Sequence, residues 1–116
     1  MYTDVSKLQV HQKSHKLVLK VYAITKEFPK EEQFGLTSQM RRAAVSVPSN
    51  ISEGKARGSN KDYRRFLLMS RGSLAELTYQ LLLAKDLKYI EADQYEDLLN
   101  LADEVGKMLN GLIGRL

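Results

Sequence analysis

His11 and His15 are four residues apart, a spacing that places both imidazoles on the same face of a helix. Two histidines at this spacing bind zinc in the metalloprotease motif, where a glutamate directly after the first histidine is the general base. Here that position holds Gln12, and no third ligand is evident, although zinc sites usually have three or more protein ligands. We therefore interpret the pair as polar residues at a helix edge and predict neither a metal nor a cofactor.

Serine chemistry is equally poorly supported. No histidine neighbours the candidate serines in the sequence, and no strand-turn-helix elbow presents them; they are Ser46, Ser49, Ser70 and Ser73. Glu53 would share a polar helix face with Arg42, which superficially resembles an acid-base pair. A salt-bridged or interface stripe explains that face more simply, because carboxylates on helices usually serve as solvated or paired charges. We expect no enzymatic activity.

Positive charge is concentrated between Arg41 and Arg71. Only Glu53 and Asp62 oppose eight basic residues there, whereas the whole chain has a net charge of +4. Clustered arginines can contact phosphate groups in a bidentate manner, so this segment is the best candidate for binding RNA or DNA. The alternative is a solvated face, or a surface that pairs with acidic residues of another copy. The predicted phosphate-contacting residues are Arg41, Arg42, Lys55, Arg57, Lys61, Arg64, Arg65 and Arg71.

The turn that follows the first part of this segment, GKARGS, contains glycine and lysine. It lacks both the spacing of a phosphate-binding loop and the strand that precedes one. Tyr63 and Phe66 are interleaved with the basic residues, but they match an apolar stripe and are predicted to be core residues.

The chain of 116 residues fits a single domain spanning 1–116. It has no cysteine, which excludes disulfides, thiolate zinc sites and cysteine nucleophiles. No segment has the length of a signal-peptide core or of a membrane span, so we expect a cytoplasmic protein with no membrane partner.

The basic segment must be positioned by helices, because apolar residues recur at three- and four-residue steps almost throughout. The pattern predicts helices over about 4–28, 36–54, 60–87 and 92–113, with the second ending between Gly54 and Gly58. Pro48 lies inside the second helix and should kink it. Long helices with short connections predict an all-α, antiparallel, up-down-up-down four-helix bundle.

The third predicted helix has a second apolar stripe besides the one expected to face the core. A peripheral helix of a monomer needs only one such stripe, so we predict that the second one contacts another subunit. Gly72 in the same helix is expected to mark a close backbone approach. The residues of this interface stripe are Leu68, Ala75, Tyr79 and Leu82.

Nearly the whole chain resembles the family of 23S rRNA intervening-sequence proteins. The resemblance lies in KSHKLVLKVYAITKEFPKEEQFGLTSQMRRAAVSVPSNISEG, YRRFLLMSRGSLAELTYQLLLAKDLKYI and LADEVGKMLNGLIGRL, in that order. Lys88 departs from the family, which commonly has glycine there. The resemblance implies a small bacterial four-helix bundle without established enzymatic activity. Similar folds form homopentamers, and related accessory proteins of diversity-generating retroelements bind nucleic acid and a reverse transcriptase. The family name describes gene location, not rRNA binding.

Two hypotheses follow. The first is a non-catalytic oligomeric bundle, with a homopentamer implied by the resemblance, that contacts RNA or DNA phosphates through the basic segment. The second is a structural or adaptor protein with protein partners only. In that case the basic segment pairs with an acidic partner, or with Glu96, Asp97 or Glu104 of a neighbouring copy.

Overall fold

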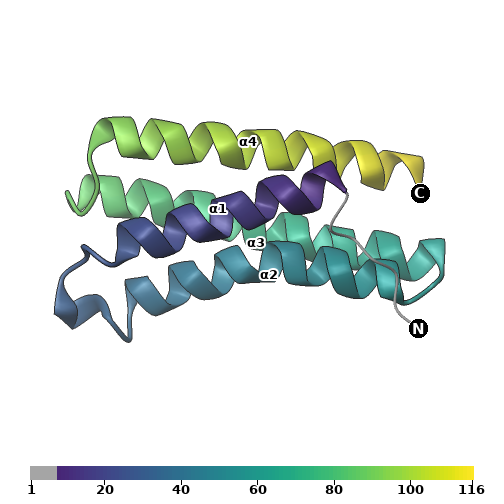
Figure 1. Cartoon of the computed structure of the whole chain (residues 1–116), viewed down its shortest axis with the longest axis horizontal. Helices are drawn as coiled ribbons and strands as arrows, with labels where there is room; N and C mark the ends of the chain where they lie inside the picture. The colour runs from purple at the N-terminus through teal and green to yellow at the C-terminus, as the bar shows by residue number, and fades with distance from the viewer. Residues whose placement is uncertain (1–7) are drawn as a thin grey trace.

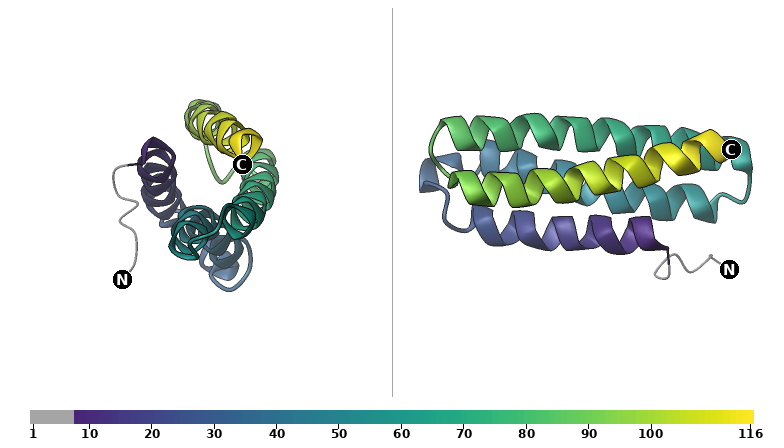
Figure 2. Two further views of the ribbon diagram at one scale, coloured as in Figure 1. Left: turned by 90° about the vertical axis from the view of Figure 1, so that its right-hand side faces the viewer. Right: turned by 90° about the horizontal axis from the view of Figure 1, so that it is seen from above.

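The computed structural model describes residues 8–116 and shows four antiparallel helices side by side (Figure 1). They are α1 (Gln9–Thr25), α2 (Leu36–Ala56), α3 (Asn60–Asp86) and α4 (Ala92–Arg115), with a short 3-10 helix η1 (Lys30–Glu32) before α2. The described residues contain no strand. The bundle measures 43 × 24 × 21 Å, and both views of Figure 2 show the helices following its long axis. The predicted four-helix bundle is confirmed. The predicted helix start near Asp4 lies outside the described residues.

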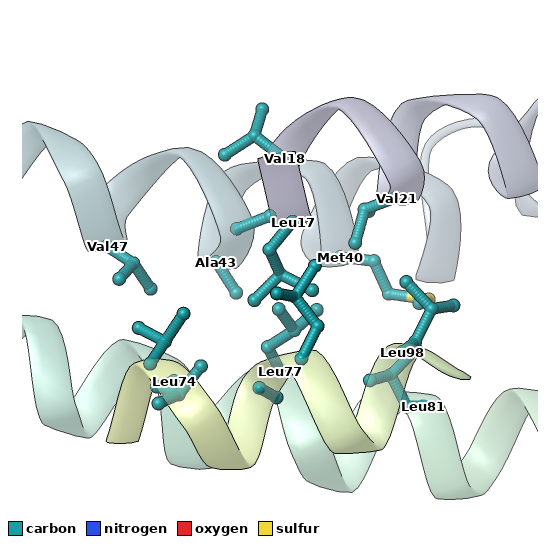
Figure 3. Close-up of a cluster of buried hydrophobic side chains, with 14 of the residues drawn as sticks. Leu17, Val18, Val21, Met40, Ala43, Val47, Leu74, Leu77, Leu81 and Leu98 are labelled. Carbon is teal, nitrogen blue, oxygen red and sulfur yellow. The ribbon is translucent and has the colours of Figure 1, made fainter. Parts of the chain in front are cut away.

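The core is built from one apolar stripe of each helix. Figure 3 shows Leu17 and Val21 of α1, Met40 of α2, Leu77 of α3 and Leu98 of α4 directed toward a common centre. Each of these side chains is at most 1% exposed. Burying a side chain of this size contributes roughly 1.5–3 kcal/mol, so the stripes stabilise the helices that carry them.

α1 ends at Thr25, three residues before the predicted end at Phe28. The amides of Glu27 and Phe28 donate to carbonyls three residues back, so the chain tightens into a 3-10 turn. Pro29 explains this early end, because the residue before a proline avoids the α-helical region. Phe28 is nevertheless buried, with its ring centroid 5.3 Å from that of Tyr89.

α2 continues through Pro48, and a bend at that point stays a prediction. Side chains donate to carbonyl groups around the proline. Asn50 Nδ2 lies 2.8 Å from the carbonyl oxygen of Ser46, and the hydroxyl of the fully buried Ser70 on α3 lies 2.7 Å from that of Val47. These bonds tie the proline-containing turn to its neighbours, which suits a helix that has lost one backbone donor.

The α2–α3 connection turns at Gly58, whose φ of +85° is the left-handed conformation that glycine adopts without strain. α3 then begins at a capped end, because the Ser59 hydroxyl accepts a hydrogen bond from the amide of Asp62 at 3.1 Å. α2 ends at Ala56, within the predicted window from Gly54 to Gly58, and Gly54 lies buried in its last turn.

The opposite end of the bundle is held by Glu32. Its Oε1 accepts a hydrogen bond from the amide of Leu36 at 3.2 Å, and its Oε2 accepts one from the hydroxyl of Tyr89 at 2.8 Å. One carboxylate therefore connects the start of α2 with the α3–α4 connection. In that connection Lys88 has φ +65°, and the amide of Tyr89 donates to the carbonyl of Ala84.

Candidate nucleic-acid interface

Basic residues gather at the end of the bundle where α2 turns into α3 and where α4 finishes (Figure 1, right). Lys55 and Arg57 lie at the end of α2, and three more follow in the first turns of α3. The sequence analysis missed Arg115, in the last turn of α4. The basic end is defined by Lys55, Arg57, Lys61, Arg64, Arg65 and Arg115.

Aromatic rings hold three of these cations in place. The guanidinium carbons of Arg57 and Arg65 lie 4.9 Å and 4.6 Å from the centroid of the Phe66 ring, and Nζ of Lys55 lies 5.3 Å from that of Tyr63. Both rings belong to buried residues, as predicted. Their faces restrict the cations, because a positive group is attracted to an aromatic face by about 0.5–1 kcal/mol at exposed sites. One buried ring thus brings a guanidinium group from the end of α2 and one from the start of α3 to the same point of the surface.

Ion pairs neutralise part of the basic end. Arg57 Nη2 lies 2.9 Å from Glu53, and Arg65 Nη2 lies 3.5 Å from Asp62, both one helical turn apart in the same helix. Such exposed pairs contribute well below 1 kcal/mol, so a phosphate can compete with them. Lys61 and Arg64 are exposed and make no ion pair with any residue between 8 and 116. They are the cations most available to an anion.

Arg115 joins the basic end through the antiparallel order of the helices. Burial raises the pKa of the Tyr63 hydroxyl, and the positive charge of Arg115 partly opposes that rise. In Figure 1 the last turn of α4 and the α2–α3 turn lie at the same end of the bundle, which agrees with this influence. Because the two residues are far apart in sequence, only the bundle topology could have predicted their proximity.

The structure separates the remaining predicted residues from the basic end. Arg42 precedes Arg57 by 15 positions in α2, which is about 22 Å along a helix. Arg41 is directed toward α1, where its Nε donates to the Thr25 hydroxyl at 2.9 Å and its guanidinium lies 4.6 Å from the ring centroid of Tyr22. The predicted single patch is therefore two clusters of cations on one molecule.

Arg71 lies further along α3 than the basic end. Its Nη1 donates to the side-chain oxygen of Asn110 on α4 at 3.0 Å. It remains exposed, so it extends the positive surface along the α3–α4 side.

The two histidines of α1 do not converge with other ligands. Nε2 of His11 lies 3.1 Å from the hydroxyl of Ser52 on α2, and His15 is exposed. Within the part of the chain that the structure describes, no three His, Asp or Glu side chains gather as a metal site would require. His11 instead links α1 to α2. In the same part of the chain, no helix is long and apolar enough to span a membrane.

The family model of the 23S rRNA-intervening sequence proteins matches residues 6–111, almost the full chain. The chain belongs to this family. A crystal structure of a protein of unknown function from the S23 ribosomal protein family of Bacteroides thetaiotaomicron VPI-5482 has the same fold. It is 27% identical, with a TM-score of 0.83, and the match covers 90% of this chain and 97% of that one. No curated protein matches the chain.

This member of the 23S rRNA-intervening sequence family exposes the predicted interface stripe of α3. Tyr79 is 63% exposed and Leu82 is 37% exposed. Ala75 is exposed and Leu68 is half-buried. The whole predicted stripe is thus available, at least in part, to a partner.

Gly72 in the same stripe does not make the close approach predicted for it within this chain. No atom lies within 4 Å of the position that a methyl group would take there. Gly54 makes the close approach instead, against α3. Whether Gly72 approaches a second copy stays a prediction.

Two of the three acidic residues proposed to pair with a neighbouring copy are engaged within this chain. Lys20 Nζ lies 2.8 Å from Asp97, and Lys13 Nζ lies 3.3 Å from Glu104, so both carboxylates bridge α4 to α1. Glu96 is exposed. Pairing of Asp97 or Glu104 with another copy would have to replace these contacts.

Proposed function

We propose that this bacterial, cytoplasmic protein is a non-catalytic homo-oligomer that contacts the phosphates of RNA or DNA through its basic end. The observation that carries the proposal is the pair of guanidinium groups over Phe66, with Arg64 and Lys61 free beside them. Planar guanidinium groups present donors that match phosphate oxygens in a bidentate manner.

The position of the basic end favours backbone contact over base reading. The cations lie around a turn and three helix ends, and all of them except the half-buried Lys55 are exposed. Contacts of this kind position a protein on nucleic acid without selecting a sequence. Several copies in one oligomer would multiply a modest patch through avidity, which requires no additional contact in each copy.

Binding of labelled RNA and duplex DNA across a salt series tests the proposal. Fluorescence anisotropy should show log affinity falling with log salt, by a slope near −0.9 for each phosphate contact on duplex DNA. The double variant R64A/R65A should weaken binding and flatten the slope by about 2 on duplex DNA. The matched control is K16A/K26A, which removes the same charge from exposed positions in α1 and at its C-cap. Equal slopes for the two variants would contradict the proposal.

The second candidate is a structural or adaptor protein with protein partners only. The exposed apolar stripe around Tyr79 and Leu82 favours it, because such a surface suits a protein interface. In that case R64A/R65A would change the molecular mass in solution, and neither RNA nor DNA would bind at low salt. Light scattering on the same samples separates the two functions.

A further inference from the structure

A groove lies beside the second cluster of cations, at the junction of α1, the η1–α2 loop and α2. Its volume is about 460 Å³, which is within the range of ligand sites. The side chains on which the inference depends are Tyr22, Phe34, Thr37, Ser38, Arg41 and Arg42, and we call it the Phe34 groove.

Phe34 is 90% exposed, the highest value among the large apolar side chains between residues 8 and 116. Its ring lines the groove but covers no core residue, so the fold leaves an aromatic face in water. Exposed aromatic rings of this kind serve as platforms on which nucleic-acid bases stack in proteins that bind single strands.

Two arginines adjoin this ring. Arg41 is fixed by the Thr25 hydroxyl and the Tyr22 ring, whereas Arg42 is exposed and makes no ion pair with any described residue. A second hollow shares Phe34, Ser38 and Arg42 and extends to Glu76 on α3. The carboxylate of Glu76 disfavours an anion at that side, so an anion is expected on the Arg41 side. Thr37 and Ser38, whose hydroxyls can donate hydrogen bonds, also line the groove.

We propose that the Phe34 groove binds a nucleotide of single-stranded RNA or DNA, with its base stacked on Phe34 and its phosphate on Arg41 and Arg42. The inference rests on the proposed function and narrows its ligand, because a base inside a duplex has no free face to offer. A strand bound at the basic end would reach the groove after about 22 Å, the length of α2 between the two clusters.

The test compares single strands that differ only in their bases. The probes are labelled 12-residue oligo(U) and oligo(dT), together with an abasic deoxyribose-phosphate strand of the same length and charge. The wild-type protein should bind the strands with bases about tenfold more tightly than the abasic strand. F34A should remove this difference, whereas L19A, which truncates another exposed apolar side chain on α1, should retain it.

Equal affinities of the wild type for abasic and intact strands overturn the inference. If R64A/R65A still weakens binding in that case, the proposed function is retained and only the nucleotide site in the Phe34 groove is rejected. If no single strand binds, the inference falls, and the salt series on duplex DNA decides the proposed function separately. A change in molecular mass in solution for F34A, but not for L19A, would also overturn the inference. It would assign the groove to a second copy of the chain. Preference for oligo(U) over oligo(dT), or the reverse, identifies which nucleic acid the supported groove accepts.

Discussion

Gly54 and Phe66 lie in close contact between α2 and α3: a methyl group on Gly54 would lie 2.6 Å from Cβ of Phe66. Atoms cannot remain at that distance, so one of the helices would have to move. The same contact brings the end of α2 onto the ring that holds the two arginines of the basic end. Close packing and the arrangement of cations therefore depend on one glycine.

Gly54→Ala should consequently destabilise the protein by about 2 kcal/mol or more, despite the better helix propensity of alanine. Gly72→Ala is the matched control, because it makes the same change in a helix where nothing lies within 4 Å. It should stabilise the fold by about 0.5–1 kcal/mol. Urea unfolding at equal protomer concentration measures both. Destabilisation by the Gly72 change would show that this position packs against another copy.

Lys88→Gly should stabilise the protein by about 1 kcal/mol. Lys88 has φ +65°, and a side chain in this left-handed conformation carries a steric cost that glycine lacks. The control is Lys107→Gly at an exposed position inside α4, which should instead lose about 1 kcal/mol. Thermal and urea unfolding of the two variants should thus shift in opposite directions. A loss of stability in both variants would contradict the left-handed conformation of Lys88.

Tyr63→Phe should stabilise the fold by about 1 kcal/mol. The Tyr63 hydroxyl is buried and has no hydrogen-bond partner among the described residues, and an unsatisfied buried polar group costs free energy. The ring, with its contact to Lys55, is retained in phenylalanine. Urea unfolding near neutral pH checks this prediction, and a loss of stability would reveal a partner for the hydroxyl.

The same residue predicts a dependence on pH. Burial raises the pKa of Tyr63 above 10.0, so the unfolded chain loses this proton at lower pH than the folded one. The contribution of this pKa difference to the free energy of unfolding is therefore complete below pH 10. It is lost as the pH rises through the pKa of Tyr63 in the folded protein. Above pH 10, wild-type stability should fall more steeply than that of Tyr63→Phe. Parallel curves for the two proteins would contradict this cause.

Tyr79→Glu should dissociate the oligomer if the interface stripe of α3 joins two copies. The charge would enter the centre of a surface that now exposes 63% of an aromatic side chain. Leu19→Glu places the same charge on an exposed apolar position of α1, outside the stripe, and should leave the mass unchanged. Light scattering gives the answer directly. A monomeric wild type would remove the interface prediction altogether.

Helical periodicity was sufficient to predict the four helices and the residues at the centre of their core. It could not predict the burial of Gln80, which is polar yet only 4% exposed. A pattern of apolar residues gives no information on a buried amide. It also treated the basic residues as one patch. Spacing along the sequence does not measure distance along a helix axis, so the separation of Arg42 from Arg57 appeared only in three dimensions.

The bond between Glu32 and Tyr89 makes the molecule unequal at its two ends. At that end, one carboxylate clasps both connections. At the other end, residues 56–61 of the α2–α3 connection are all exposed, and exposed segments of this kind open most readily. Local unfolding should therefore begin at the basic end and reach the hydrogen bonds of Glu32 last. A polyanion bound there would act as a brace, slowing amide exchange in the final turn of α4 from outside the fold.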